Sequence, residues 1–246
     1  LGRLIGLLYL FPFLYFLIKK KIDKKFQFQL YLIFFSILIQ GFIGWYMVMS
    51  GLTENTDVSH YRLSLHLTLA FIIFVMLLWN YLKFTNKRKI ETKTYFPNYI
   101  LITFLILIFL QISVGALVSG LDAGQIYQTW PLMNQYYFPD DSKINELFSV
   151  KSFEIPSLVQ FMHRNLAYLI LLVFSFFSLN IFRNKSYIYL RKTTFYVFLF
   201  LLLQVFLGIL TILSGAHIVI ASAHQVSSIF LVTFSLVLVF KNTKIN

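Results

Sequence analysis

The sequence predicts an all-α integral membrane protein, because its apolar residues form long runs and its charges collect between them. Of the 246 residues, 59% are hydrophobic and 12% are charged, whereas soluble globular proteins have about 25% charged residues. Most of the 21 lysines and arginines lie in short segments between apolar runs. This pattern orients helices in a membrane. The formal net charge of +12 therefore reflects membrane topology, and we expect no nucleic-acid partner.

Seven apolar runs are long enough to cross the hydrocarbon core of a bilayer, which takes about 20 helical residues. In chain order they are residues 1–18, 28–49, 61–82, 98–120, 158–182, 194–213 and 221–240. Basic residues follow the first, third, fifth and seventh runs, so the positive-inside rule places these connectors on the cytoplasmic or matrix side. The chain then starts on the outer side. That start predicts one more helix upstream, hence an N-terminally truncated chain with seven transmembrane helices of eight.

An internal repeat predicts that the helices form two similar halves. Residues 40–51 contain the pattern Gln-x3-Gly-x5-Ser-Gly, and residues 204–215 repeat it with identical spacing. Each pattern precedes a helix that carries a histidine near its outer end, His66 in one half and His224 in the other. Duplication of this kind is a known membrane architecture. We therefore predict two pseudo-symmetric four-helix bundles.

The two halves divide the chain near its middle. Residues 1–94 form an incomplete N-terminal half, and residues 95–246 form a C-terminal four-helix bundle with an outer loop at 121–157. The loop is rich in aromatic residues, which would either cover a hydrophobic ligand or anchor in the membrane interface. The repeat also pairs Leu1 with Leu166. The counterpart of His163 would then precede the first residue of this chain.

Histidine is the main ligand candidate, since the chain has no cysteine and its apolar runs contain no carboxylate. A histidine within a transmembrane span is costly and usually faces the bundle interior. His66, His163 and His224 each lie in the first turns of a helix that enters from the outer side. Haem iron binds imidazole, and haems sit between facing helices in bundle cores. We predict a haem between His163 and His224; the alternative is a neutral histidine that is hydrogen-bonded between helices.

Neighbouring residues suit a flat macrocycle. Small side chains leave space beside the ligands at Ala167 and at Ala221 or Ala223. Polar side chains one turn from a histidine could hydrogen-bond to it, at Gln160, Ser227 and Ser228.

The remaining histidines and the nearby arginines receive no assigned role. Arg62 lies one turn before His66, where its guanidinium would either meet a haem propionate or snorkel to the membrane surface. His60 and His217 lie in outer connectors, where a solvated imidazole is the ordinary case. Arg164 adjoins His163 and points to a different part of the helix surface.

Six motifs spread over the chain resemble those of one family. They are Gln-Gly-x-x-Gly-Trp-Tyr-Met-Val-x-Ser-Gly-Leu at 40–52, Asp-Val-Ser-x-Tyr-Arg-Leu-Ser-Leu-His-Leu at 57–67, Gly-Ala-Leu-Val-Ser-Gly-Leu-Asp-Ala-Gly at 115–124, Tyr-x-Thr-Trp-Pro-Leu-Met at 127–133, Val-Gln-Phe-x-His-Arg-x-Leu-Ala-Tyr at 159–168 and Ala-His-Gln at 223–225. With these motifs the chain resembles the haem A synthase family, in its mitochondrial and proteobacterial branch.

The resemblance implies an oxidoreductase with two haem sites. The C-terminal bundle would hold a b-type haem (haem b) between His163 and His224, and the N-terminal bundle would bind haem O with His66 as one of its histidines. The enzyme oxidises the C8 methyl of haem O to the formyl group of haem A, with electrons passing through the b haem. It supplies terminal oxidases from the bacterial cytoplasmic or mitochondrial inner membrane. Haem O synthase, an electron donor and a homo-oligomer are further partners that the resemblance leaves open.

The chain departs from the family pattern in three respects. The family's Glu-x-x-His-Arg segment, which carries a glutamate implicated in the chemistry, would end just before Leu1. The catalytic residue is therefore unknown here, and we expect the fragment to be catalytically incomplete. Gln160 occupies the duplicated position and cannot act as a carboxylate, and His60 stands where the family has proline.

Two other functions remain open from the residues alone. A bis-histidine membrane b-type cytochrome would use the same ligands and act only as an electron carrier. A transporter built from duplicated halves would use the histidines as substrate contacts.

Overall fold

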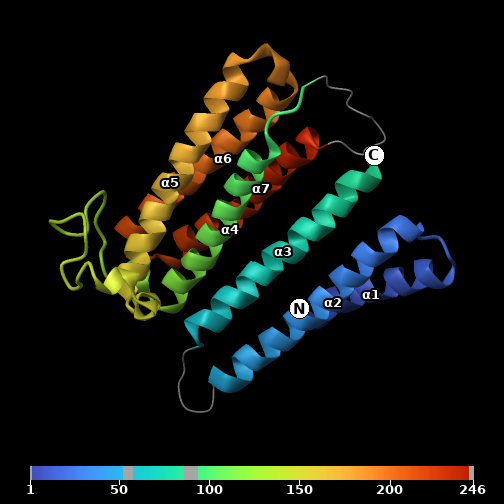
Figure 1. The fold of residues 1–246 in the computed structure, drawn as a ribbon. Coiled ribbons are helices and arrows are strands. Elements are labelled where there is room, and N and C mark those ends of the chain that lie inside the picture. Colours follow the sequence, from blue (N-terminus) through green and yellow to red (C-terminus); the bar gives the residue numbers. More distant parts are fainter. Residues whose placement is uncertain (1, 52–57, 86–93, 244–246) are drawn as a thin grey trace. The chain divides into compact units, whose positions relative to one another are not determined.

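The computed structural model describes residues 2–51, 58–85 and 94–243, and within them the regular structure is helical. The α-helices are α1 (Gly2–Ile18), α2 (Lys24–Gly51), α3 (His60–Thr85), α4 (Asn98–Gly120), α5 (Pro156–Arg183), α6 (Ile188–Leu213) and α7 (Ile218–Asn242) (Figure 1). Six of these seven helices are long and apolar enough to span a membrane, whereas α1 is apolar but has 17 residues. The predicted all-α membrane fold is confirmed. The basic connector at 86–93 lies outside the described residues.

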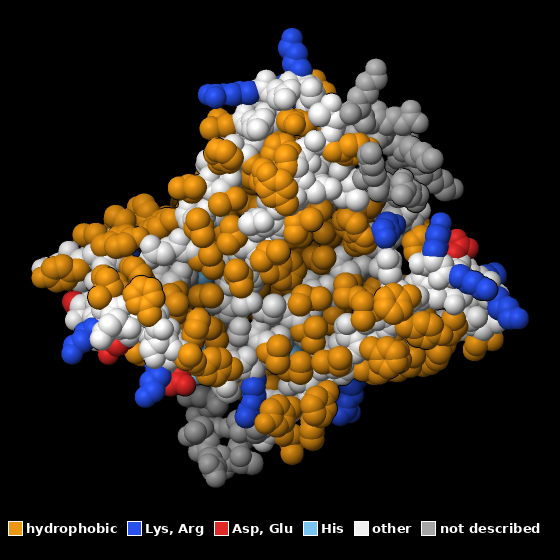
Figure 2. Space-filling model, in the orientation of Figure 1, with side chains coloured by type: hydrophobic (Ala, Val, Ile, Leu, Met, Phe, Trp, Pro, Cys, Tyr) orange, Lys and Arg blue, Asp and Glu red, His pale blue; other side chains and the backbone are white. Residues whose placement is uncertain are grey.

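Large apolar side chains point outwards along the helices. Figure 2 shows hydrophobic side chains over much of the visible face, while lysines and arginines lie mostly towards its margins. Phe28, Phe84, Phe176 and Leu172 are among the most exposed. Apolar surface facing water costs about 25 cal/mol per Å², so these surfaces belong against lipid tails. The chain is a multi-pass membrane protein.

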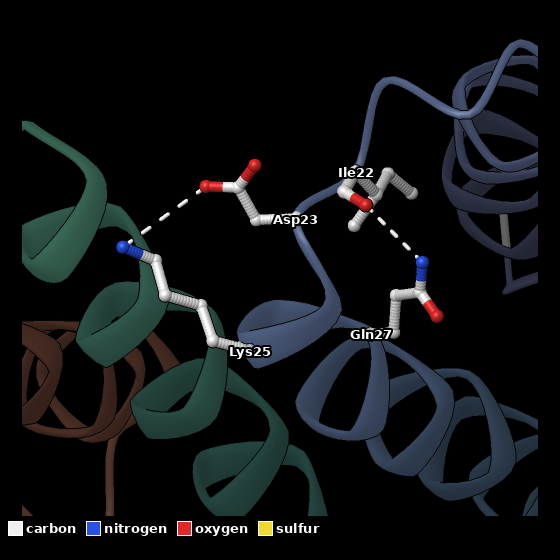
Figure 3. Close-up of polar contacts among 4 residues, drawn as sticks. All are labelled: Ile22, Asp23, Lys25 and Gln27. Atoms are coloured by element: carbon white, nitrogen blue, oxygen red, sulfur yellow. Dashed lines mark hydrogen bonds and ion pairs between the residues drawn. The ribbon is translucent and has the colours of Figure 1, made fainter.

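The chain divides into two compact units, Leu1–Lys87 and Arg88–Asn246. In the first unit, α2 packs against both α1 and α3. A short turn joins α1 to α2 (Figure 3): the Gln27 side-chain amide donates to the carbonyl of Ile22 at 3.1 Å, and Lys25 pairs with Asp23 at 4.0 Å. The ion pair is exposed and contributes little to stability. The division into halves at residues 94 and 95 stays a prediction.

The second unit is a ring of four helices. Helix α4 packs against α5 and α7, and α6 packs against the same two helices. Helices α5 and α7 therefore lie on one diagonal of the bundle, with α4 and α6 on the other. The rings of Phe104, Phe174 and Phe177 pack together in its interior, with centroids 5.1 to 5.7 Å apart.

The end of the bundle opposite the histidines is closed by Asn242. Its buried carboxamide accepts hydrogen bonds from the backbone N–H of Phe96 at 2.9 Å and from the Tyr189 hydroxyl at 2.7 Å. The same group donates to the carbonyl of Phe96 at 2.7 Å and to Asn98. A buried amide with a full set of partners fixes its neighbours. Asn242 thus ties the end of α7 to the starts of α4 and α6.

Candidate functional site

The structure places the three predicted histidines on three helices. His163 lies on α5 and His224 on α7, the diagonal pair of the second unit. His66 lies on α3, in the first unit. All three side chains are half-buried in their own unit.

A glutamine of the preceding helix contacts His163. The side-chain amide nitrogen of Gln111, on α4, lies 3.2 Å from Nε2 of the imidazole. The same amide donates to the backbone carbonyl of His163 at 3.1 Å. An amide group has two hydrogens and can serve both acceptors. One glutamine therefore contacts both the ring and the backbone of this histidine.

The first unit contains the same arrangement. The amide nitrogen of Gln40, on α2, lies 3.2 Å from Nε2 of His66 and donates to the carbonyl of His66 at 3.0 Å. The two sites agree in both contacts although they belong to different units.

The site at His224 keeps one of these contacts. Gln204, on α6, donates to the carbonyl of His224 at 3.1 Å, and its amide nitrogen lies 2.5 Å from the Ser227 hydroxyl. That hydroxyl also donates to the carbonyl of His224 at 3.0 Å. The bond from a glutamine amide to the histidine carbonyl is thus common to all three sites.

A glycine lies one turn after each glutamine and faces the same histidine. A Cβ atom built on Gly44 or Gly115 would lie 2.9 Å from Cε1 of His66 or His163, and one built on Gly208 would lie 3.2 Å from Cε1 of His224. Ordinary contact begins at about 3.4 Å. Glycine is required here because each imidazole lies directly against the backbone of the preceding helix.

The sequence signal for these contacts is Gln-x3-Gly, at residues 40–44, 111–115 and 204–208. Residues four apart lie on one face of a helix, so the glutamine and the glycine reach the same partner. The first and third copies appear in the predicted repeat. The repeat predicted from the sequence did not include the second copy, at 111–115, although it has the same spacing.

The residues present fit a haem. Nδ1 of each of the three imidazoles is buried and has no hydrogen-bond partner, which is costly for a polar atom away from water. The described residues contain no group of three or more histidines, cysteines or carboxylates that could hold a bare metal ion. Two imidazoles on diagonal helices instead suit a metal that brings its own planar ligand.

Comparison with known proteins identifies the family. Residues 1–236 match the COX15-CtaA family model, described as cytochrome oxidase assembly protein. The chain belongs to this family.

Several relatives of the chain are named haem A synthase. The one from Pelagibacter ubique (strain HTCC1062) is 43% identical over 244 residues, which cover 99% of this chain and 71% of the relative. The one from Wolbachia pipientis wMel is 39% identical over 240 residues, with 96% and 66% covered. The one from Flavobacterium johnsoniae is 39% identical over 244 residues, with 95% and 69% covered. The chain thus spans 66 to 71% of the length of these relatives.

Two residues near His163 on α5 hold the outer loop by hydrogen bonds. Gln160 was expected beside a histidine, but its amide donates to the carbonyl of Tyr127 at 3.0 Å. Arg164 donates to the same carbonyl at 3.0 Å and to the carbonyl of Leu132 at 3.2 Å. Both side chains are buried. The prediction that Gln160 is a polar partner of His163 is therefore wrong, because the side chain points to the loop and Gln111 takes that place from α4.

The outer loop is folded against the start of α5. It contains the short helices η1 (Ala123–Gln125), η2 (Glu146–Phe148) and η3 (Val150–Glu154), of which η1 and η3 contact α5. The Tyr127 hydroxyl donates to Asp140 within the loop, and the Trp130 indole N–H donates to the Tyr168 hydroxyl at 3.1 Å. Burial and the hydrogen bond to Asp140 raise the pKa of Tyr127 to about 12. The phenol therefore remains a donor throughout the physiological pH range.

The structure also places the three residues to which the sequence assigned no role, Arg62, His60 and His217. The guanidinium of Arg62 lies over the ring of Tyr46, 4.5 Å from its centroid. The ring of His60 packs on Tyr61 with centroids 4.1 Å apart. His217 is exposed and precedes the first residue of α7.

Arg164→Met is expected to loosen the outer loop. Methionine is of similar length but donates no hydrogen bond, so the carbonyl of Leu132 loses its arginine donor, and a hydrogen bond to a charged group contributes about 1.5 to 3 kcal/mol. Limited proteolysis within residues 121–155 should become about tenfold faster, since about 1.4 kcal/mol corresponds to a factor of ten in an equilibrium. Arg191→Met is the matched control, because Arg191 contacts carbonyls near the other end of α5. Equal cleavage rates in both variants would contradict the assignment.

Proposed function

We propose that this protein is a haem A synthase, an oxidoreductase that converts haem O to haem A for terminal oxidases. The reaction oxidises the C8 methyl of haem O to a formyl group. The observation that carries the proposal is the recurrence of one histidine setting, with its glutamine and glycine, in both units of a chain whose relatives are named haem A synthase.

The second unit is proposed to hold a b-type haem between His163 and His224. The two residues come from the diagonal helices α5 and α7, so a haem bound between them would be held by two helices that lie opposite each other in the bundle. A bound b haem supplies an iron centre that accepts and donates single electrons. The outer loop folds against the start of α5, where it would limit the access of water to the bound haem.

The first unit is proposed to bind the substrate haem O, with His66 as a ligand to its iron. His66 has the same glutamine and glycine contacts as His163, so the two histidines are prepared for the same kind of bond. Arg62 lies one helical turn from His66, with its guanidinium over the ring of Tyr46, and would be placed to pair with a propionate of a haem bound at His66.

The membrane is proposed to be the bacterial cytoplasmic membrane, with the basic connectors facing the cytoplasm. The relatives that are named haem A synthase come from bacteria. An enzyme that supplies haem O is a partner that this reaction requires. Successive hydroxylations of a methyl group also need an external oxidant, together with a donor for the electrons that pass through the b haem. A bis-histidine electron carrier, which uses the same ligands, is not favoured by the family match.

Pigment extraction tests the proposed function. The full-length protein is expressed in a bacterial host that makes haem O and lacks its own haem A synthase, and the extracted haems are separated by chromatography. We expect haem A to appear at the expense of haem O. Retention of b haem with unchanged haem O would instead indicate an electron carrier. Purified protein without any haem would favour the transporter.

A further inference from the structure

We infer, on the basis of the proposed function, that Gln40, Gln111 and Gln204 are positioning residues that set the orientation of the three haem-binding histidines. Each glutamine belongs to the helix that precedes its histidine in the chain. Each donates from its side-chain amide to the backbone carbonyl of that histidine, at 3.0, 3.1 and 3.1 Å. The repeated unit is therefore a helical hairpin that carries Gln-x3-Gly on its first helix and histidine on its second.

The carbonyl contact fixes the backbone from which the ligand projects. A helix carbonyl already accepts a hydrogen bond from the N–H four residues later, and a second donor from a neighbouring helix fills its other lone pair. This bond sets the depth and the rotation of the histidine relative to the preceding helix. The bond to the carbonyl itself uses neither ring nitrogen, so it is compatible with iron bound to the imidazole.

At His163 and His66 the imidazole ring has two further contacts with the preceding helix. The amide nitrogen of the glutamine lies 3.2 Å from Nε2 in both cases. The glycine one turn later lies against Cε1, where even a Cβ atom would be too close. An imidazole has two side-chain torsions, and two contacts from one helix face restrict both of them. Few competing partners exist, because the hydrocarbon core of a membrane contains no water.

Residues that orient a metal-binding histidine affect how tightly the metal is bound. Groups that orient a ligating histidine typically contribute about 10- to 100-fold to metal affinity. A ligand must be held to within about 0.5 Å of its productive position. The glutamines satisfy this requirement without touching the iron, so they act through the histidines and not as catalytic residues.

Gln111→Met tests the inference, because methionine has a similar length and cannot donate a hydrogen bond. The full-length protein is purified with its b haem, and two properties are measured: the electron paramagnetic resonance spectrum of the oxidised low-spin haem and the rate of haem transfer to apomyoglobin. We expect shifted or broadened resonances and haem transfer about 10- to 100-fold faster. Gln225→Met is the matched control, since Gln225 adjoins His224 and its side chain is exposed. It should match the parent protein in both measurements.

The outcomes separate the inference from the proposed function. A parent protein with b haem and a Gln111→Met variant with the same spectrum and transfer rate would overturn the positioning role and leave the proposed function intact. A parent protein that binds no bis-histidine haem would overturn both. Gln204→Met carries the same expectation through the carbonyl of His224, so the comparison does not depend on one variant folding.

Discussion

Replacing His163 with alanine is expected to remove the bis-histidine b haem from the second unit. His163 supplies one of the two imidazoles carried by the diagonal helices α5 and α7, and alanine has no group that can bind iron. The optical and paramagnetic signals of the low-spin haem should be lost almost completely. Haem content per protein, measured after purification in detergent, should fall in parallel.

A histidine outside the bundle provides the control. His217 lies before the first residue of α7, is exposed, and makes no side-chain capping hydrogen bond. His217→Ala should retain the parent spectrum and haem content. If His163→Ala also kept the low-spin spectrum, the assignment of this residue as an iron ligand would be refuted.

The apolar runs predicted the helices because a helix in lipid must be long, continuous and apolar. They did not predict where each helix ends. Helix α6 begins at Ile188, six residues before its predicted run, and includes Arg191 and Lys192. Backbone hydrogen bonding continues beyond the hydrocarbon core, where polar side chains carry no penalty. Hydropathy therefore marks the part of a helix within the membrane and not its full length.

The histidines could be chosen from sequence because an imidazole in a membrane span needs a partner. Their neighbours could not be assigned in the same way. Gln160 lies one turn before His163 and looked like its partner, yet it holds the loop carbonyl of Tyr127. Gln111, which does contact His163, precedes it by 52 positions. Contacts between helices depend on how each helix is rotated, and a periodic pattern in one chain segment does not fix that rotation.

Gly115→Ala is expected to impair haem binding while leaving the bundle folded. The added Cβ would lie 2.9 Å from Cε1 of His163, so the ring must move by about 0.5 Å to regain ordinary contact, which is the tolerance of a binding site. The clash falls on the far end of a side chain and not on the backbone, and alanine favours a helix over glycine by about 0.5 to 1 kcal/mol, so the bundle should stay folded. The loss should therefore appear in ligation: haem transfer about tenfold faster or more, with unchanged helical circular dichroism.

The contacts at other glycines predict a graded series. A Cβ on Gly208 would lie 3.2 Å from Cε1 of His224, so Gly208→Ala should have a smaller effect on haem transfer than Gly115→Ala. A Cβ built on Gly41 would have no other atom within 4 Å, so Gly41→Ala should leave haem binding unchanged. Because all three changes add one methyl group to a helix, a ranking that failed to follow these distances would show that the imidazoles are not held by close contact with the preceding helix.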